Sequence, residues 1–430
     1  MTRVDSLLHQ VRINGRVRSR FRPYIEPLED RWLPSVLTVT STADSGPGTL
    51  RADLAAAQNG DTIIFALPNP STIQLTSGTL NITSSISIAG PGSSALTVKG
   101  NATFPIFNVA STDTISGLTI SGGGFGSPQG NQNGGGIFNT GTLNLSSCAI
   151  TGNSAGAFGT EFGSGGGIYN AGIMTVNGCV ISGNRCNSDG GGIAAASNAT
   201  TTVTASTISS NTAVGLFLVR GTSPAFGGGI SNSGSMLVQN TVMTGNNAGS
   251  GDGGAISNSG PLTIVDCTIA SNTASSNIGS SGGGIDSGGV TTIRDSTIAN
   301  NAATGLPPPV HLGGAGSGAG GGIAISQSFT LSNCTIFGNS ATGGDSGSGF
   351  QPGDGEGGGL AITLSSGQTG LIANCTIAGN HANGGQGSGG VNGNGMGGGI
   401  VLGTAGTTNL DNTIVATNAA STADGHRRQC

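Results

Sequence analysis

One short motif recurs nine times along this chain and constrains its fold more than any other feature. The motif is Gly-Gly-Gly-Ile or a close variant, and its last residue falls at Ile137, Ile168, Ile193, Ile230, Ile256, Ile285, Ile323, Leu360 and Ile400. Internal repetition of this kind is typical of solenoids, in which each repeat packs only on its neighbours. We therefore expect a solenoid and not a compact globular domain.

A second rhythm follows each motif and indicates how the chain turns. Six positions are separated by 2, 3, 2, 3 and 2 residues, and in the first coil they are Leu143, Leu145, Cys148, Ile150, Asn153 and Ala155. A spacing of 2 keeps both side chains on one face of a strand, and a spacing of 3 adds a corner residue. Helical spacing of apolar residues is absent, and the abundant Gly, Thr, Ser and Asn disfavour a helix.

This pattern predicts an all-β fold, a right-handed parallel β-helix solenoid of about 11–12 coils stacked about 4.8 Å apart. An asparagine occupies one corner of every regular coil, at Asn153, Asn184, Asn211, Asn246, Asn272, Asn301, Asn339, Asn380 and Asn418. Because an amide side chain both donates and accepts hydrogen bonds, we interpret these residues as a structural ladder and not as a binding site.

Most of the cysteines follow the same repeat. Cys148, Cys179, Cys267, Cys334 and Cys375 share one inward position, Cys186 replaces an alanine, and Cys430 lies outside the repeat. We expect the repeat cysteines to pack as small buried residues, although stacking would bring Cys334 and Cys375 towards disulfide distance. There is no CxxC motif and no histidine at metal-ligand spacing from a cysteine, so no metal and no cofactor are predicted.

The sequence suggests four segments. They are a basic leader over 1–35, a cap with irregular opening coils over 36–123, the nine-coil β-helix over 124–420 and a short tail over 421–430. Within the cap, Thr49 is expected to begin a short helix that covers the edge of the first coil. At the other end three alternatives stay open, namely a truncated chain, end-to-end self-association or closure by the tail.

Opening strands are expected at Thr62–Phe65, Thr72–Leu75, Ile86–Ala89 and Leu118–Ser121.

Charge limits the partners. Seven of the fourteen Lys and Arg residues lie in the first 31 positions, and the remainder of the chain is acidic. The body has no basic stripe for phosphate binding, so nucleic acid is not expected as a partner. The sequence contains no run of 18 apolar residues, so no transmembrane helix is predicted. The basic N-terminus lacks the apolar segment of an ordinary secretory signal.

Several segments resemble known bacterial surface proteins. The elements GGGIYNAG, CTIFGNSA and GGAI, the last at Gly253–Ile256, resemble the repeats of polymorphic outer membrane proteins and adhesin-like passenger β-helices, with TIxxN here in place of FxxN. That resemblance covers 134–420 and implies the architecture. The stretch IEPLEDRWLP, Ile25–Pro34, resembles the PLEDR-type element of large surface proteins and implies an extracellular or cell-envelope location.

The leading functional prediction is a non-enzymatic surface or matrix protein, adhesin-like, that presents loops to a glycan or a cell-surface protein. Between the alanine corner and the isoleucine of the next motif lie 6 to 19 residues, so length varies along one edge of the rod. Most are Gly-rich and are explained as simple connectors. Two carry apolar or rigid residues, namely Leu216, Phe217, Leu218, Val219 and Arg220 in one, and Pro307, Pro308, Pro309 and His311 in the other.

The alternative is a polysaccharide lyase or glycoside hydrolase of the pectate-lyase-like fold. Such enzymes need a base with acidic calcium ligands, or carboxylates that face each other on adjacent coils. The best acidic candidates are Asp266 and Asp295, at the same corner of successive coils next to Arg294. An exposed pair of this kind is more typical of solvated surface, so no catalytic residue is assigned.

Calcium binding by the Gly-Asp loops is a third hypothesis. Asp345, Asp354 and Glu356 are isolated and lack the nonapeptide rhythm of calcium-binding repeats, so only weak binding is expected.

Overall fold

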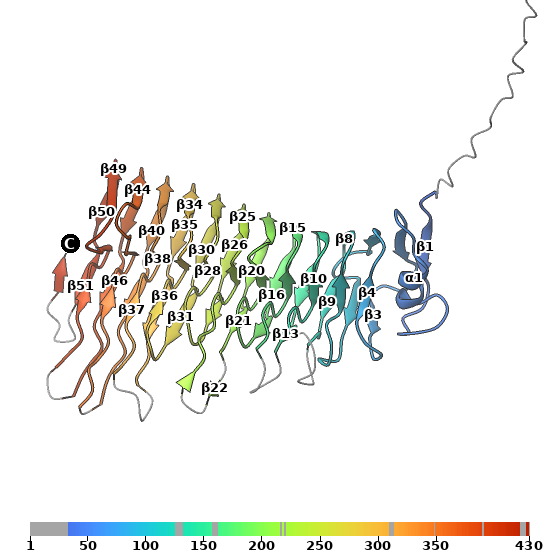
Figure 1. Ribbon diagram of the computed structural model, residues 1–430, viewed down its shortest axis with the longest axis horizontal. Coiled ribbons are helices and arrows are strands. Elements are labelled where there is room, and N and C mark those ends of the chain that lie inside the picture. The colour runs from blue at the N-terminus through green and yellow to red at the C-terminus, as the bar shows by residue number, and fades with distance from the viewer. Residues whose placement is uncertain are drawn as a thin grey trace, which may run out of the picture. The chain divides into compact units, whose positions relative to one another are not determined.

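The computed structural model describes residues 33–124, 132–156, 162–215, 217–218, 221–308, 314–347, 349–388, 391–421 and 427–429, with the backbone alone for 217–218, 221–222 and 427–429. The chain divides into two units, Met1–Leu33 and Pro34–Cys430. Within the second unit, short strands stack in register from α1 at one end to β49 at the other (Figure 1).

Each regular coil contributes one strand to each of four sheets, and every strand pair within the stack is parallel. This arrangement confirms the right-handed parallel β-helix that the sequence predicts. Parallel pairing between successive coils satisfies the backbone N–H and C=O groups along the whole stack.

The first sheet has 13 strands, β1 Val36–Val39, β2 Thr62–Phe65, β5 Ser87–Ala89, β8 Thr112–Ser116, β11 Thr142–Ser146, β15 Ile173–Asn177, β19 Thr200–Thr204, β25 Ser235–Gln239, β29 Leu262–Val265, β34 Thr291–Arg294, β39 Phe329–Ser332, β44 Thr369–Ala373 and β49 Thr407–Asp411. The second sheet has 12, β3 Ser71–Gln74, β6 Leu96–Lys99, β9 Thr119–Ser121, β12 Ala149–Thr151, β16 Val180–Ser182, β20 Thr207–Ser209, β26 Val242–Thr244, β30 Thr268–Ala270, β35 Thr297–Ala299, β40 Thr335–Phe337, β45 Thr376–Ala378 and β50 Ile414–Ala416.

The GGGI sheet is formed by the strands that begin at the motif isoleucines and by two opening strands. It comprises β4 Leu80–Ile82, β7 Phe107–Val109, β10 Ile137–Asn139, β14 Ile168–Asn170, β18 Ile193–Ala195, β24 Ile230–Asn232, β28 Ile256–Asn258, β33 Ile285–Ser287, β38 Ile323–Ile325, β43 Leu360–Ile362 and β48 Ile400–Leu402. The fourth sheet comprises β13 Ser154–Ala155, β17 Arg185–Cys186, β21 Thr212–Ala213, β27 Asn247–Ala248, β31 Thr273–Ser276, β36 Ala302–Gly305, β41 Ser340–Thr342, β46 His381–Asn383, β51 Ala419–Ser421 and the antiparallel β52 Arg427–Gln429.

The triple glycine makes the tight turn that leads into each GGGI strand. Its first glycine has a positive φ in every regular coil, for example +61° at Gly282. A Cβ atom there would lie 2.2 Å from the carbonyl oxygen of Ile285, so only glycine fits. The motif therefore specifies a backbone bend, and the isoleucine that follows enters the core.

The predicted asparagine ladder is confirmed. Asn301 shows the pattern, because its Oδ1 accepts hydrogen bonds from the backbone N of Asn272 at 3.0 Å and from its Nδ2 at 2.9 Å. The Nδ2 of Asn301 donates to Oδ1 of Asn339 at 3.0 Å and to the carbonyl oxygen of Ile269. Equivalent bonds join neighbouring coils from Asn153 to Asn418.

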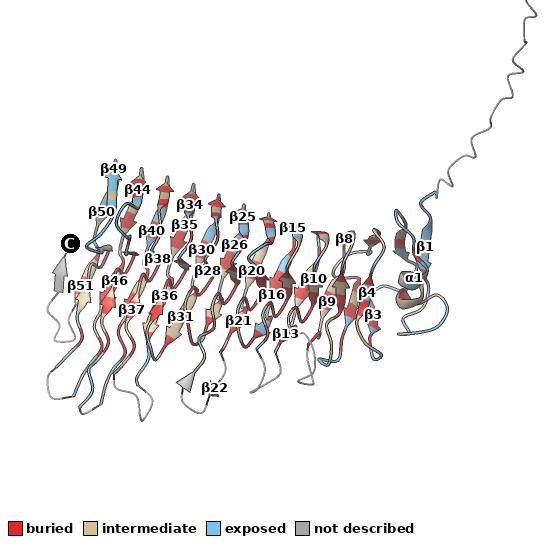
Figure 2. Cartoon of the chain, in the orientation of Figure 1, coloured by how far each residue is buried: buried red, intermediate tan, exposed pale blue. Residues whose placement is uncertain are grey.

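The core is a continuous column of aliphatic side chains inside the stack (Figure 2). The repeat cysteines lie in or beside it, as predicted: Cys148, Cys179, Cys186, Cys267, Cys334 and Cys375 are buried and not in disulfides. The stacked pair considered for a disulfide makes a different contact, because the backbone N of Cys334 donates to Sγ of Cys375 at 3.4 Å.

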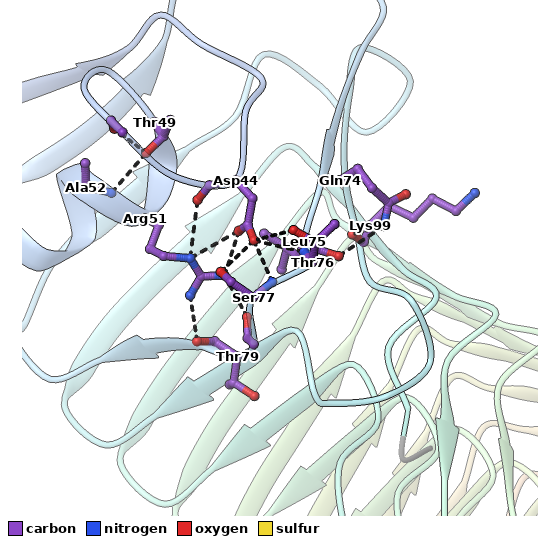
Figure 3. Close-up of polar contacts among 12 residues, drawn as sticks. Asp44, Thr49, Arg51, Ala52, Gln74, Leu75, Thr76, Ser77, Thr79 and Lys99 are labelled. Carbon is purple, nitrogen blue, oxygen red and sulfur yellow. Dashed lines mark hydrogen bonds and ion pairs between the residues drawn. The ribbon is translucent and has the colours of Figure 1, made fainter. Parts of the chain in front are cut away.

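The N-terminal cap contains the expected helix, α1 Leu50–Ala56, whose N-cap Thr49 accepts a hydrogen bond from the backbone N of Ala52. An ion pair of 2.7 Å between Arg51 and Asp44 links the helix to the preceding loop (Figure 3). The carboxylate of Asp44 also accepts hydrogen bonds from Ser77 at 2.6 Å and from Thr76. Burial alone would raise the pKa of Asp44, but these hydrogen bonds outweigh it and hold the pKa well below its usual range.

Two features differ from the sequence interpretation. Four of the variable connections form a further parallel sheet, β32 Ser280–Ser281, β37 Gly318–Ala319, β42 Gly355–Glu356 and β47 Gly395–Met396, so these stretches extend the coils and are not simple connectors. The opening region also contains β4, β6, β7 and β8, which the sequence pattern did not indicate. No helix in the described part of the chain is long and apolar enough to cross a membrane.

Candidate functional site

The outward residues of the GGGI sheet form one continuous surface along the stack, which we call the GGGI face. In register order they are Asn81, Asn108, Phe138, Tyr169, Ala194, Ser231, Ser257, Asp286, Ala324, Ala361 and Val401. They alternate along each strand with the inward isoleucine and a second inward residue. Side chains from different coils therefore lie side by side on this face.

An aromatic pair marks one part of the GGGI face. The rings of Phe138 and Tyr169, on β10 and β14, are stacked with centroids 5.5 Å apart and an interplanar angle of 5°. Both side chains are partly exposed. On the N-terminal side of the pair, Phe138 also lines a small hollow of about 210 Å³ with Asn81, Asn108 and Asn133.

A second hollow, of about 290 Å³, lies on the same face over β24, β28 and β33. We call it the acidic hollow, and its lining residues are Asp189, Phe226, Ser231, Asn232, Ser233, Ser257, Asn258, Ser259, Asp286 and Gly288. No lysine or arginine belongs to this lining. Eight of these ten residues carry a hydroxyl, amide or carboxylate group that could bind a polar ligand.

The carboxylates reach this face in two ways. Asp286 is the outward residue of β33, whereas Asp189 and Asp252 come directly before the glycines of the motif. Each of these two accepts a backbone hydrogen bond from the next coil, Asp189 from the N of Phe226 at 3.2 Å and Asp252 from the N of Ser281 at 2.6 Å. Oδ2 of Asp189 also accepts a hydrogen bond from Oγ of Ser188 at 3.1 Å, so both oxygens of Asp189 and one oxygen of Asp252 have a structural role.

Asp286 has no such role, because it makes no hydrogen bond or ion pair with the residues that the structure describes. Burial, with an added contribution from the charge of Asp252, raises the pKa of Asp286 to about 7. Burial also raises the pKa of Asp189 and of Asp252, although their hydrogen bonds oppose the shift. The hollow thus combines one carboxyl group that titrates near neutral pH with two others nearby.

A second ladder lines the inner side of this face. Nδ2 of Asn139 donates to Oδ1 of Asn170 at 2.7 Å, and in the next group Nδ2 of Asn232 donates to Oδ1 of Asn258 at 2.7 Å. The ladder is interrupted at Ala195, which pairs with Asn232 in the register. As a result, the buried Oδ1 of Asn232 accepts no hydrogen bond from the described residues.

The acidic pair predicted from the sequence lies elsewhere. Asp266 and Asp295 occupy equivalent exposed corners after β29 and β34, both with positive φ. Asp295 forms an ion pair of 3.1 Å with Arg294 and accepts a hydrogen bond from Nδ2 of Asn333 at 3.0 Å. Asn333 and Asn374 have the same backbone conformation in later coils, so these aspartates are explained by turn preference.

The loop candidates are described only in part. Leu216, Arg220 and His311 lie outside the described residues, and Phe217 is described by its backbone alone, in β22 Phe217–Leu218, which pairs antiparallel with β23 Gly221–Thr222. Two of the three carboxylates considered for calcium instead tie loops together: Asp345 accepts from the backbone N of Gln386 at 2.7 Å and Asp354 from that of Asn394 at 2.6 Å. Among the described residues, no group of three or more His, Cys, Asp or Glu could hold a metal ion.

The sequence analysis missed the acidic hollow although a signal was present. Asp189 and Asp252 directly precede the glycine turn, and Asp286 directly follows its isoleucine. These aspartates flank a motif whose own residues are explained by the fold, so the repeat pattern does not single them out.

No protein-family model matches this chain. No curated protein matches it either. Similar solved structures include the Dettilon tailspike protein gp208, with 15% identity, a TM-score of 0.41 and coverage of 87% of this chain and 68% of that chain. The A-module of the Azotobacter vinelandii mannuronan C-5 epimerase AlgE6 has 14% identity, a TM-score of 0.47 and coverage of 87% and 97%. Pectate lyase Pel9A has 14% identity, a TM-score of 0.35 and coverage of 79% and 78%. Because these sequence identities and TM-scores are low, the function of this chain has to be argued from its own residues.

Proposed function

We propose that this protein is a non-enzymatic, extracellular or cell-envelope β-helix that binds glycans along its GGGI face. The observation that carries the proposal is the pair of hollows lined by polar residues on one face, with the aromatic pair Phe138 and Tyr169 between them. Aromatic rings pack on apolar sugar faces, and amide, hydroxyl and carboxylate groups bind sugar hydroxyls. An extended face suits a chain-like ligand that contacts several coils.

The charge of the face argues against a lyase that acts on acidic polysaccharides. Such a reaction needs a base and positive charge near the substrate carboxylate, whereas the lining of the acidic hollow contains carboxylates and no lysine or arginine. The same carboxylates would repel pectate-like or alginate-like chains. Neutral or amino-substituted glycans are therefore the favoured ligands.

The test is glycan-array binding by the full chain, run together with assays for released reducing ends and unsaturated products. We expect binding without turnover, and we expect Tyr169→Ala to weaken it about tenfold or more. Phe337→Ala is the matched control, because Phe337 is an exposed aromatic residue on β40 outside the GGGI face. Turnover would contradict the non-enzymatic proposal, and equal loss in both variants would contradict binding at this face.

Glycoside hydrolysis is a second candidate, favoured by one observation. Asp286 has a pKa of about 7 and lies in the field of Asp252, and a protonated carboxylic acid beside a carboxylate is the pair that hydrolases use. In this case the assay would detect reducing ends, and Asp286→Asn would abolish their release while the protein remains folded. Absence of any product from all arrayed glycans would count against this candidate.

End-to-end self-association stays a proposal. In the last described coil, two residues at positions that are inward elsewhere are exposed, Leu402 at 52% and Leu410 at 44%. Their partners in the preceding coil, Ile362 and Ile372, are at 1% and 0%. In the described part of the tail, β52 pairs with β51. A second copy stacked on β48 and β49 would cover this end. Light scattering of the wild type and of Leu410→Lys tests it, and a monomeric wild type at high concentration would contradict it.

A further inference from the structure

The acidic hollow offers acceptors of hydrogen bonds and almost no positive charge. Asp189 and Asp286 line it, and Asp252 lies close enough for its charge to act on Asp286. Asp286 has no hydrogen bond or ion pair with any described residue. A carboxylate held partly buried without a counter-charge is unfavourable, and a bound cation would relieve this.

A second, independent group in the same hollow also lacks a donor. Asn232 lines the hollow and is 1% exposed, yet its Oδ1 accepts no hydrogen bond from the described residues. Its Nδ2 is already used, because it donates to Oδ1 of Asn258 and to the carbonyl oxygen of Gly234 at 3.0 Å. The unmet requirement of this hollow is therefore for hydrogen-bond donors, and a buried unsatisfied acceptor is costly without them.

The ligand that fits this requirement is an ammonium group. A protonated amine supplies three donors and no acceptor, together with the positive charge that Asp286 and Asp252 lack. A divalent metal fits less well, because no group of three His, Cys, Asp or Glu in the described part of the chain could hold one. The hydroxyl groups of Ser231 and Ser257 make no hydrogen bond with described residues. They are available to bind sugar hydroxyls on the same face.

We infer that the acidic hollow binds the protonated amine of an amino sugar, so that the ligand of the GGGI face is a polysaccharide with free amino groups. The inference rests on the proposed glycan-binding function and specifies its ligand class. Asp286 and Asp189 would contact the amine-bearing ring, and Asp252 would add charge from beside it.

The test compares two probes that differ only at the amine, a β-1,4-linked glucosamine pentamer and its fully N-acetylated counterpart. Calorimetric titration of the full chain is expected to give at least about tenfold tighter binding of the free amine, the value of one charge-assisted hydrogen bond. This comparison uses the wild-type protein and does not depend on whether a variant folds. Equal affinity for the two probes, or preference for the acetylated one, would overturn the inference.

Two double variants test whether the amine binds in the acidic hollow. Asp252→Asn with Asp286→Asn is expected to lose the preference for the amine, while the matched double change Asp266→Asn with Asp295→Asn removes the same charge at exposed corners and is expected to keep it. Equal loss in both double variants would show non-specific attraction and overturn the inference. Binding of calcium alone, abolished by the first double variant only, would also overturn it in favour of a metal.

The failures of the two proposals can be distinguished. If neutral glycans bind in a manner that depends on Tyr169 but amino sugars have no advantage, the ligand class is wrong and the glycan-binding function stands. If no glycan of any charge binds, both are wrong.

Discussion

Asn301 illustrates how single residues of this protein connect coils. Its side chain satisfies the backbone N of Asn272 and bonds Asn339 on the other side, so one amide contributes to two interfaces between coils. Both neighbours, Asn272 and Asn339, are buried. The ladder therefore stabilises the stack because removal of one member leaves unsatisfied groups on both sides.

Asn301→Ala is expected to lower the free energy of unfolding by about 2–4 kcal/mol, because it leaves a buried N–H of Asn272 and a buried Oδ1 of Asn339 with fewer partners. Chemical denaturation measures the change. Asn144→Ala is the control, since Asn144 is exposed on β11 and is expected to change stability by less than about 0.5 kcal/mol. Similar losses in the two variants would contradict a special role of the ladder.

Asp286 gives the stability a defined pH dependence. Its pKa is about 7 in the folded protein and near its ordinary value of 3.8 when unfolded. Between these pH values the folded state holds a proton that the unfolded chain releases, so its contribution to stability is complete below pH 3.8 and is lost as pH rises through about 7. Asp286→Asn removes this loss.

Asp286→Asn and the wild type should accordingly have similar melting temperatures at pH 4. At pH 8 the variant should melt at a higher temperature, with an unfolding free energy greater by about 1–3 kcal/mol. Asp266→Asn, at an exposed corner, should show no such trend. A constant difference at both pH values would mean that Asp286 titrates normally in the fold.

At the scale of elements, the turn into each GGGI strand decides where the functional residues lie. The positive φ of the first glycine bends the chain so that the residue before the motif lies on the same face as the outward residue after its isoleucine. This bend brings Asp189 and Phe226 beside Ser231 in the acidic hollow. The same element that begins the core strand thus builds one wall of the site.

Gly282→Ala should destabilise the protein by about 3 kcal/mol or more, because the new Cβ would lie 2.2 Å from the carbonyl oxygen of Ile285 in a backbone conformation that alanine avoids. Gly288→Ala is the control, since its Cβ would be 3.8 Å from the nearest atoms. Thermal unfolding of both variants measures the difference. If Gly282→Ala has the same melting temperature as the wild type, the turn is more adaptable than its geometry indicates.

At the scale of the whole molecule, stability is distributed along the stack. Each coil packs mainly on its two neighbours, so the free energy is a sum of similar interfaces and has no single centre. The six described cysteines belong to this column as buried free thiols, and burial raises the pKa of the Cys186 thiol. Reactive thiolate is therefore disfavoured at Cys186 in the folded state, whereas a hydrogen bond from Cys334 lowers the pKa of the Cys375 thiol.

Thiol titration should show at least six more reactive groups after denaturation than before it, since the described cysteines are buried and free. Addition of a reductant should leave the melting temperature unchanged. A lower melting temperature in reductant would mean that stacked thiols such as those of Cys334 and Cys375 are oxidised.

The sequence by itself determined the fold, because the repeat spacing, the glycine turn and the asparagine corner each specify a local conformation that is repeated nine times. It also placed the Thr49-capped helix and the inward cysteines, which depend on neighbours close in sequence or on strict periodicity. Only the tertiary structure decided which polar residues share a surface. Asp189, Ser231 and Asp286 come from different coils, and their proximity depends on stacking register and on one bend per coil, neither of which local spacing reveals.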